Sequence, residues 1–96
     1  MAPRKTRELE TGLTAKGFRK DDTHHEMYWF FLAGRKTSVR TRISHSTKEY
    51  GDHLLGQMAR QVRLQRGEFD DLVECPLSGT EYAQLLIDRG HVRSGE

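Results

Sequence analysis

The sequence predicts one α+β domain in which a helix precedes a three-stranded antiparallel sheet and further helices follow it. Two observations carry this prediction. From Thr37 to Ser44, apolar and polar residues alternate with the period of a half-buried strand. On both sides of the sheet region, apolar residues recur at helical spacing, and capping motifs open the later helices. An antiparallel sheet covered by helices on one face accommodates this order.

Length and composition place the chain among small globular domains. Its 96 residues suffice for one hydrophobic core. No apolar run is long enough to cross a membrane, and no apolar segment follows the basic residues at the start, so we expect no signal peptide. The single cysteine, Cys75, excludes an internal disulfide, and we interpret it as buried and inert. A reducing cytoplasm is the simplest setting.

Charge is distributed unevenly along the chain, although the formal net charge is only +2. The first 48 residues carry 11 Lys/Arg and 5 Asp/Glu, whereas the last 48 carry 5 Lys/Arg and 9 Asp/Glu. This asymmetry favours one face that binds polyanions. An ordinary solvated surface is the alternative.

One helix and one strand are expected before the central hairpin. Leu9 and Leu13 share a face of a helix predicted from Thr6 to Lys16, and Gly17 follows as its left-handed cap. We expect the residues before Thr6 to be frayed. Phe18 to Asp22 is predicted to pair as the first strand.

The hairpin joins an aromatic strand, His25 to Leu32, to a basic strand, Thr37 to Ser44, through a turn that lies within residues 33–36. An even-numbered turn fixes which side chains share a face, whereas a three-residue turn or a bulge would shift the assignment by one. The core face would hold Tyr28, Phe30, Leu32, Val39 and Ile43, and the open face would hold His25, Met27, Trp29, Arg40 and Arg42.

Helices are predicted for the rest of the chain. Ser46-Thr47-Lys48-Glu49 is a capping box that would open a helix running to about Gln65, with Gly67 ending it. Phe69, Leu72 and Val73 suit a short helix that stops ahead of Pro76. Ser78-Gly79-Thr80-Glu81 would open a last helix that Gly90 closes. We expect residues 1–96 to form a single domain.

His24 and His25 are the candidate catalytic residues. A histidine titrates near neutral pH and can move a proton, and RNA supplies its own nucleophile in the 2′-hydroxyl. Because successive strand residues point in opposite directions, the alternation selects His25 for the basic face. A surface or core-edge histidine pair without a catalytic role is the alternative.

Four basic residues of the hairpin are candidates for binding a phosphate backbone. Arg35, Lys36, Arg40 and Arg42 have no acidic residue among them and would neutralise phosphates without selecting a sequence. Trp29 on the same face could stack on an unpaired base. A solvated strand that uses charge to discourage edge pairing is the alternative. His45, just before the next element, is a further RNA-binding candidate or a turn residue.

Other chemistries are not indicated. The five histidines include no helical i,i+4 pair, and Cys75 has no ligand partner nearby, so we expect no metal. No Gly-Lys-Ser/Thr phosphate loop is present, and we expect no cofactor.

From Leu9 to Val62 the chain resembles the HicA family of bacterial toxins, which are small ribonucleases that cleave messenger RNA. The resemblance rests on Lys16-Gly17-Phe18, Thr23-His24-His25, the Gly34-Arg35-Lys36 turn, Val39 with Arg40 and Arg42, and Ser44-His45. The chain departs from the family pattern at Asp22, where the family has glycine, in a longer hairpin, and in the extension from Gly67 onward.

The resemblance implies a fold similar to a double-stranded-RNA-binding domain, with the toxin-like core over residues 6–66. It also implies a catalytic histidine at the start of the second strand. The family motif points to His24, and the alternation points to His25. The leading hypothesis is therefore a metal-independent RNA endonuclease (mRNA interferase) of a toxin–antitoxin system, restrained by a HicB-like antitoxin. A non-catalytic RNA-binding module and a protein-interaction domain remain as alternatives, and a homodimer is left open.

Overall fold

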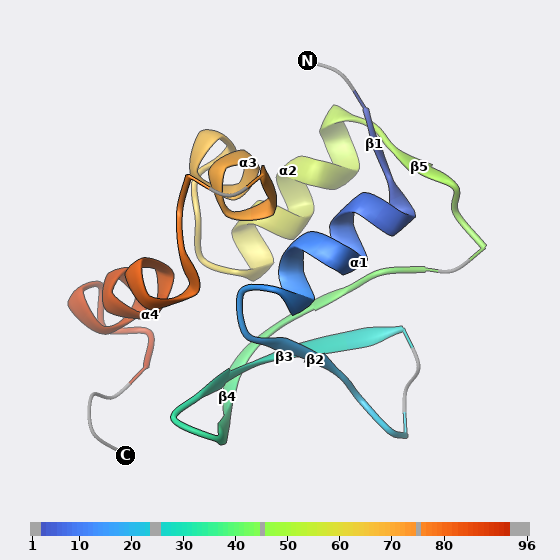
Figure 1. Cartoon of the computed structure of the whole chain (residues 1–96). Coiled ribbons are helices and arrows are strands. Elements are labelled where there is room, and N and C mark those ends of the chain that lie inside the picture. The colour runs from blue at the N-terminus through green and yellow to red at the C-terminus, as the bar shows by residue number, and fades with distance from the viewer. Residues whose placement is uncertain (1–2, 24–25, 45, 75, 93–96) are drawn as a thin grey trace.

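The computed structural model describes residues 3–23, 26–44, 46–74 and 76–92. Within these residues the chain is a small α+β domain, as predicted. Helices α1, α2 and α3 lie on one side of a three-stranded antiparallel sheet (Figure 1). The elements in chain order are β1 (Arg4–Lys5), α1 (Thr6–Thr14), β2 (Phe18–Lys20), β3 (Met27–Leu32), β4 (Arg35–Arg42), β5 (Glu49–Tyr50), α2 (Asp52–Gln61), α3 (Arg66–Glu74) and α4 (Gly79–Asp88).

The sheet has the order β2-β3-β4, so β4 is an edge strand. Leu32 pairs with Arg35 across a two-residue turn at Ala33 and Gly34. Both turn residues have positive φ, 53° at Ala33 and 81° at Gly34, which is the type I′ geometry that matches the twist of a hairpin. The turn therefore lies within the predicted residues 33–36 and has two residues, so Arg35 and Lys36 belong to β4.

The register of β3 and β4 shifts once without changing the faces of the strands. Trp29 pairs with Arg40, but Phe31 pairs with Lys36, so β4 carries two extra residues opposite Phe30. The Thr37 hydroxyl fills this irregularity: it donates to the Phe30 carbonyl at 2.7 Å and accepts from the Val39 amide at 3.2 Å. An insertion of two residues preserves the alternation of side chains, which a single-residue bulge would reverse.

The predicted division of the hairpin into two faces is confirmed for the described residues. Tyr28, Phe30, Val39 and Ile43 are buried, and Leu32 near the turn is partly buried. Arg40 and Arg42 are exposed, and Trp29 and Met27 are half-buried on their side of the sheet.

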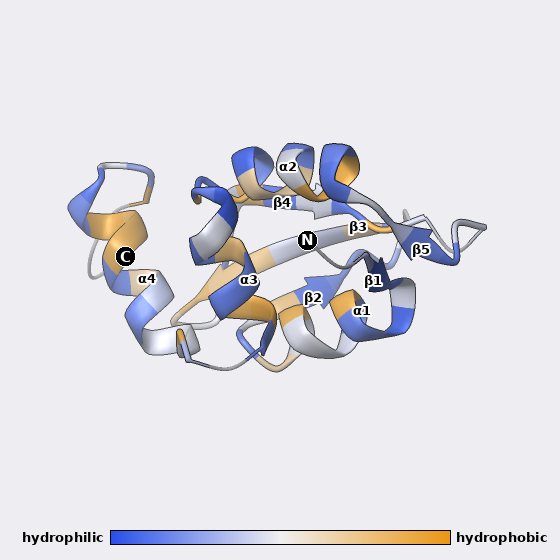
Figure 2. Ribbon diagram, turned by 90° about the horizontal axis from the view of Figure 1, so that it is seen from above, coloured by the Kyte–Doolittle hydropathy of each residue, from blue (hydrophilic) through white to orange (hydrophobic). Residues whose placement is uncertain are grey.

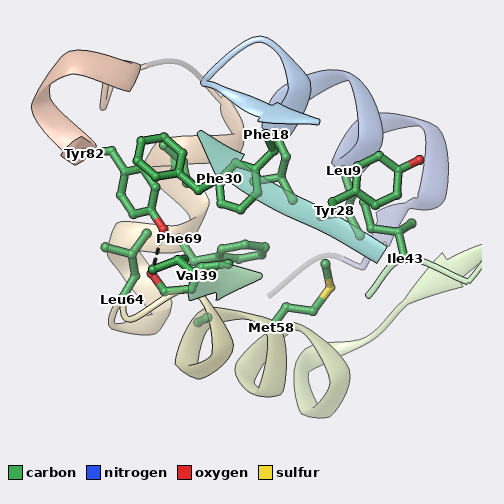
Figure 3. Close-up of a cluster of buried hydrophobic side chains, with 14 of the residues drawn as sticks. Leu9, Phe18, Tyr28, Phe30, Val39, Ile43, Met58, Leu64, Phe69 and Tyr82 are labelled. Carbon is green, nitrogen blue, oxygen red and sulfur yellow. Dashed lines mark hydrogen bonds between the residues drawn. The ribbon is translucent and has the colours of Figure 1, made fainter. Parts of the chain in front are cut away.

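One hydrophobic cluster joins the sheet to all four helices (Figure 3). At one end of the cluster, the ring centroids of Phe18, Phe30 and Tyr82 lie 4.8 to 5.8 Å apart in tilted, edge and stacked pairs. The Tyr82 hydroxyl donates to the Val62 carbonyl at 2.8 Å, and burial raises the pKa of this phenol. Helix α4 is therefore part of the same core as the sheet.

The sequence-based prediction is wrong around Glu49 and at the start of the chain. Glu49 and Tyr50 form β5, which pairs with β1 through Arg4↔Tyr50 and Lys5↔Glu49, so the residues before Thr6 are not frayed from Arg4 onward. The predicted capping box at Ser46–Glu49 does not open a helix. Tyr50 is 5% exposed, and its hydroxyl accepts from the Ser44 amide at 2.6 Å. Burial of this ring outweighs the local capping signal.

The helix boundaries in the second half also differ from the prediction. Helix α2 starts at Asp52 after an extended Gly51 and ends at Gln61, short of Gln65, while Gly67 lies inside α3 instead of ending a helix. The capping box at Ser78 is confirmed: its hydroxyl accepts from the Glu81 amide at 3.0 Å, and the Glu81 carboxylate accepts from the Ser78 amide at 2.9 Å. Among the described residues, no helix is long and apolar enough to cross a membrane.

Strand β1 is held to α3 by a half-buried cluster of ion pairs. Arg4 Nη2 lies 3.1 Å from Asp70 Oδ1, with side-chain exposures of 12% and 18%, and Arg4 also pairs with Glu74. Arg66 contacts Asp70 as well. Burial alone would raise the pKa of Asp70, but hydrogen bonds and charges from Arg66 and Arg4 outweigh it and hold the pKa below its ordinary value of 3.8.

The turn geometry predicts the effect of substituting Ala33. Asn tolerates the left-handed region, whereas a β-branched residue does not, and the exposed side chain makes no packing contribution of its own. We expect Ala33→Asn to raise the free energy of unfolding by about 0.5 kcal/mol and Ala33→Val to lower it by about 1 kcal/mol. Urea unfolding of both variants checks this, and equal stabilities would contradict the turn assignment.

The Asp70 cluster predicts a pH-dependent stability difference. A depressed folded-state pKa stabilises the fold above the unfolded pKa, and this contribution is lost as pH falls through the folded value. Asp70→Asn should therefore cost about 1.5 kcal/mol at pH 7. The difference from wild type should vanish at low pH, where Asp70 is also uncharged. Asp71→Asn, an exposed neighbour on α3, is the control and should have little effect at either pH. A pH-independent cost at Asp70 would contradict the ion-pair account.

Candidate nucleic-acid interface

A hollow of about 720 Å³ lies between β4 and α2, and Figure 2 shows α2 running alongside β4. Among the described residues, its lining contains four arginines and no acidic residue. We call it the arginine groove; it is lined by Met27, Ser38, Arg40, Thr41, Arg42, Gln57, Arg60, Gln61 and Arg63. Guanidinium groups and amides on facing walls make a concave surface for an extended anion.

The strand wall of the groove follows from the alternation of β4. Thr41 is 1% exposed between Arg40 and Arg42, and its hydroxyl donates to Gln61 Oε1 at 2.7 Å. This hydrogen bond ties the strand to the helix across the floor of the groove. The two arginines on either side of Thr41 therefore point away from the core.

Half of the backbone groups of β4 point to the free edge of the sheet, where the arginine groove lies. The Ile43 amide donates to the Glu26 carbonyl at 2.8 Å, so Ile43 and, by alternation, Thr41 direct their backbone groups to β3. The backbone groups of Arg40 and Arg42 then point outward, toward the free edge of the sheet. In the described part of the chain no further strand pairs with these backbone donors and acceptors, which lie beside the two guanidinium side chains.

The helix wall is the polar side of α2. Leu55, Met58 and Ala59 pack into the core, so Gln57, Arg60 and Gln61 are left on the outer side of the helix. Figure 2 shows polar residues on this side. The interior contacts of α2 thus determine which side chains the groove receives.

Helix α2 ends in a Schellman motif with an arginine where glycine is usual. The Leu64 amide donates to the Ala59 carbonyl at 2.8 Å, and the Arg63 amide donates to the Arg60 carbonyl at 3.1 Å. Arg63 therefore takes a left-handed backbone, with φ of 66°. A side chain in this region costs on the order of 1 kcal/mol. This strained residue projects an arginine into the groove.

Several basic side chains of the open face already have partners. Arg42 donates from Nε at 3.0 Å and from Nη2 at 2.6 Å to Glu26 Oε1. Lys36 Nζ lies 4.1 Å from the centre of the Trp29 ring, and Arg40 lies 5.1 Å from it. Two cations therefore lie against the indole, and a base that stacks on the ring competes with them for it.

Asp21, which follows β2, contacts both Trp29 and Lys36. Its Oδ2 accepts from the Trp29 indole at 2.9 Å and lies 3.5 Å from Lys36 Nζ. Its Oδ1 accepts from the Thr23 amide at 2.7 Å. Asp21 thereby fixes the orientation of the indole and the backbone that leads towards the two histidines in the chain.

The candidate residues from the sequence are divided between three places. Arg40 and Arg42 line the arginine groove, whereas Arg35 and Lys36 line a second hollow of about 380 Å³ near the hairpin turn. Trp29 lies between the two sets through its contacts with Arg40 and Lys36. His24, His25, His45 and Cys75 lie outside the described residues, so their roles stay predictions.

The helix wall was missed by the sequence analysis. Arg60 and Arg63 stand three apart on the polar side of the predicted helix, and Gln57 and Gln61 stand four apart. This spacing indicates a shared helix face, but not that the face lies beside β4. In the described part of the chain, no group of three or more His, Cys, Asp or Glu is placed to hold a metal ion.

Comparisons of the chain with protein-family models, with curated proteins and with solved structures found no match. The site is therefore characterised by its own chemistry: a groove with four arginines, two glutamines and a free strand edge on a small α+β domain.

The left-handed backbone of Arg63 predicts that two substitutions of this residue differ in stability but weaken binding alike. Arg63→Gly and Arg63→Ala both remove the guanidinium, but only glycine relieves the left-handed backbone. We expect the glycine variant to exceed the alanine variant by about 1 kcal/mol in free energy of unfolding. Thermal or urea unfolding measures the difference, and binding of a polyanion should weaken equally in both. A glycine variant no more stable than the alanine variant would argue against strain at this position.

Proposed function

We propose that the chain is an RNA-binding protein whose arginine groove holds the phosphate backbone. The observation that carries this proposal is the set of four arginines on two facing walls, where the described lining residues include no carboxylate and Glu26 binds Arg42 alone among the four in the described contacts. Arginine forks match phosphate oxygens in geometry and neutralise them without selecting a sequence. The glutamines and the outward backbone groups of β4 add donors and acceptors suited to sugars and base edges.

We further propose that the protein cleaves RNA in the manner of HicA-like toxins. In this mechanism His25 or His24 moves the proton of the 2′-hydroxyl, while Arg40 and Arg42 hold the phosphate. The support lies in the chain next to the histidines: Met27 lines the groove, and Glu26 binds Arg42. Helix α1, the strands β2, β3 and β4, and helix α2, which follows the short β5, also fit the helix, three strands and helix of a double-stranded-RNA-binding-domain-like fold.

In this proposal the protein is cytoplasmic, and an antitoxin restrains the nuclease by covering the open, basic face of the hairpin.

A non-catalytic RNA-binding module is the second candidate. It is favoured by the described lining itself, which supplies groups for binding but none that titrates near neutral pH.

The two walls of the groove should contribute alike to RNA binding. Arg40→Ala with Arg42→Ala tests the strand wall, and Arg60→Ala with Arg63→Ala tests the helix wall. Each lost phosphate contact should flatten the dependence of log K on log salt by roughly 0.7 for single-stranded RNA, so each double variant should lose about 1.4. Fluorescence anisotropy at several salt concentrations measures the slope on two unrelated sequences.

The matched control for these variants is Arg7→Ala with Lys48→Ala, which removes two exposed charges away from the groove. It should change the slope of log K against log salt by less than about 0.7, the contribution of one phosphate contact. Thermal melts taken in parallel measure stability. The free energy of unfolding should differ from wild type by no more than about 0.5 kcal/mol, because all the replaced side chains are exposed. Slopes that fall as much in the control as in the groove variants would refute a localised binding face.

Cleavage is tested separately from binding. We expect wild type to cut single-stranded RNA without added metal, and His25→Ala or His24→Ala to bind RNA with the wild-type salt slope but lose cutting by about 100-fold or more. Wild-type protein that binds RNA and leaves it intact over hours would support the binding module instead. Cutting that survives both substitutions would contradict the histidine mechanism.

A further inference from the structure

The second hollow lies at the turn end of the hairpin, against the chain that leaves α4. Its volume is about 380 Å³, and it is lined by Leu32, Arg35, Lys36, Thr37, Ser38, His91 and Val92. Ser38 lines the arginine groove as well, so the two hollows meet along β4. We propose that this second hollow is a nucleotide subsite that takes one base and its phosphate from an RNA strand lying in the groove. The inference rests on the proposed function.

The floor of the hollow suits a nucleobase. Leu32 from β3 and Val92 from beyond α4 are partly buried and pack against the core. They leave an apolar surface between the exposed hairpin residues Arg35 and Lys36 on one side and the exposed His91 on the other. His91 adds an imidazole ring at the edge. A base has apolar faces and polar edges, so it gains from an apolar floor with a ring and hydroxyls around it.

The position of His91 and Val92 is fixed by the end of α4. The His91 amide donates to the Leu86 carbonyl at 2.8 Å, and the Gly90 amide donates to the Ile87 carbonyl at 3.0 Å, with Gly90 at φ of 78°. This is a second Schellman motif, here with the usual glycine. The hollow is therefore formed by two defined backbones, the hairpin and the capped helix end.

The rim of the hollow suits a phosphate. Arg35 and Lys36 are exposed at the start of β4, and Lys36 is held over the Trp29 ring. The eight residues of β4 span about 26 Å at roughly 3.3 Å per residue, with cations at both ends. One extended polyanion can thus contact Arg42 and Arg40 in the groove and then Lys36 and Arg35 at the hollow. An RNA strand fits both the cations along this path and the apolar floor of the second hollow.

Trp29 provides the readout for the test. It is the single tryptophan of the sequence, and its ring contacts Lys36, which lines the hollow. We would titrate the full chain with the four 5′-nucleoside monophosphates and with inorganic phosphate, following Trp29 fluorescence. Millimolar binding of at least one nucleotide is expected. Inorganic phosphate should bind about tenfold more weakly, because it lacks the contact of the base.

Two variants locate the binding. Val92→Ser should weaken nucleotide binding severalfold with little effect on inorganic phosphate, whereas Arg35→Ala should weaken both ligands. Leu54→Ser replaces the exposed leucine on α2, outside both hollows, and is the matched control that should change neither. His91→Ala, at an exposed position, repeats the test if Val92→Ser fails to fold.

Each outcome decides between the inference and the proposed function. Equal affinities for phosphate and nucleotides would reduce the hollow to an anion-binding patch and overturn the subsite. Nucleotides that leave Trp29 unaffected, while RNA still binds with a groove-dependent salt slope, would overturn the subsite alone. Absence of both nucleotide and RNA binding would overturn the proposed function together with it.

Discussion

The alternation of side chains along β4 is the constraint on which the proposed site depends. Val39, Thr41 and Ile43 must be buried to complete the core, and this forces Arg40 and Arg42 outward. The two-residue irregularity opposite Phe30 leaves that constraint intact, because an even insertion does not exchange the faces of a strand. The buried hydroxyl of Thr41 then ties the strand to Gln61, and the position of α2 beside the edge of the sheet creates the groove.

Much of this arrangement could be predicted from the sequence because it depends on local periodicity. The alternation from Thr37 onward and the aromatic strand before it fix the hairpin and its faces. The start of the chain and the start of α2 could not be predicted, because their structure depends on contacts between distant residues. Arg4 reaches Asp70, and Tyr50 is buried against the core, and neither contact leaves a local signal. The helix wall was missed for the same reason: spacing shows that Arg60 and Arg63 share a face, but only tertiary packing places it opposite Arg40.

The charge asymmetry of the chain has a spatial counterpart that differs from its division into halves. Arg60 and Arg63 belong to the acidic half of the sequence but line the arginine groove. The carboxylates of α3 are largely neutralised within the fold, where Asp70 pairs with Arg4 and Glu68 pairs with Arg89. Hydrogen bonds from Arg89 lower the pKa of Glu68 accordingly. Arg42 pairs with Glu26, but the main cluster of paired acids lies on α3, outside the arginine groove, and Arg63 enters the groove from a left-handed backbone.

The central claim is that the groove between β4 and α2 is the RNA-binding face. The most direct measurement is an NMR titration of the ¹⁵N-labelled chain with a short single-stranded RNA at moderate salt. The largest amide shifts should fall on Arg40, Arg42, Arg60 and Arg63, with α1 and α3 little affected. Shifts that spread evenly over the surface, or that centre on α1 or α3 while β4 and the end of α2 stay unchanged, would contradict it.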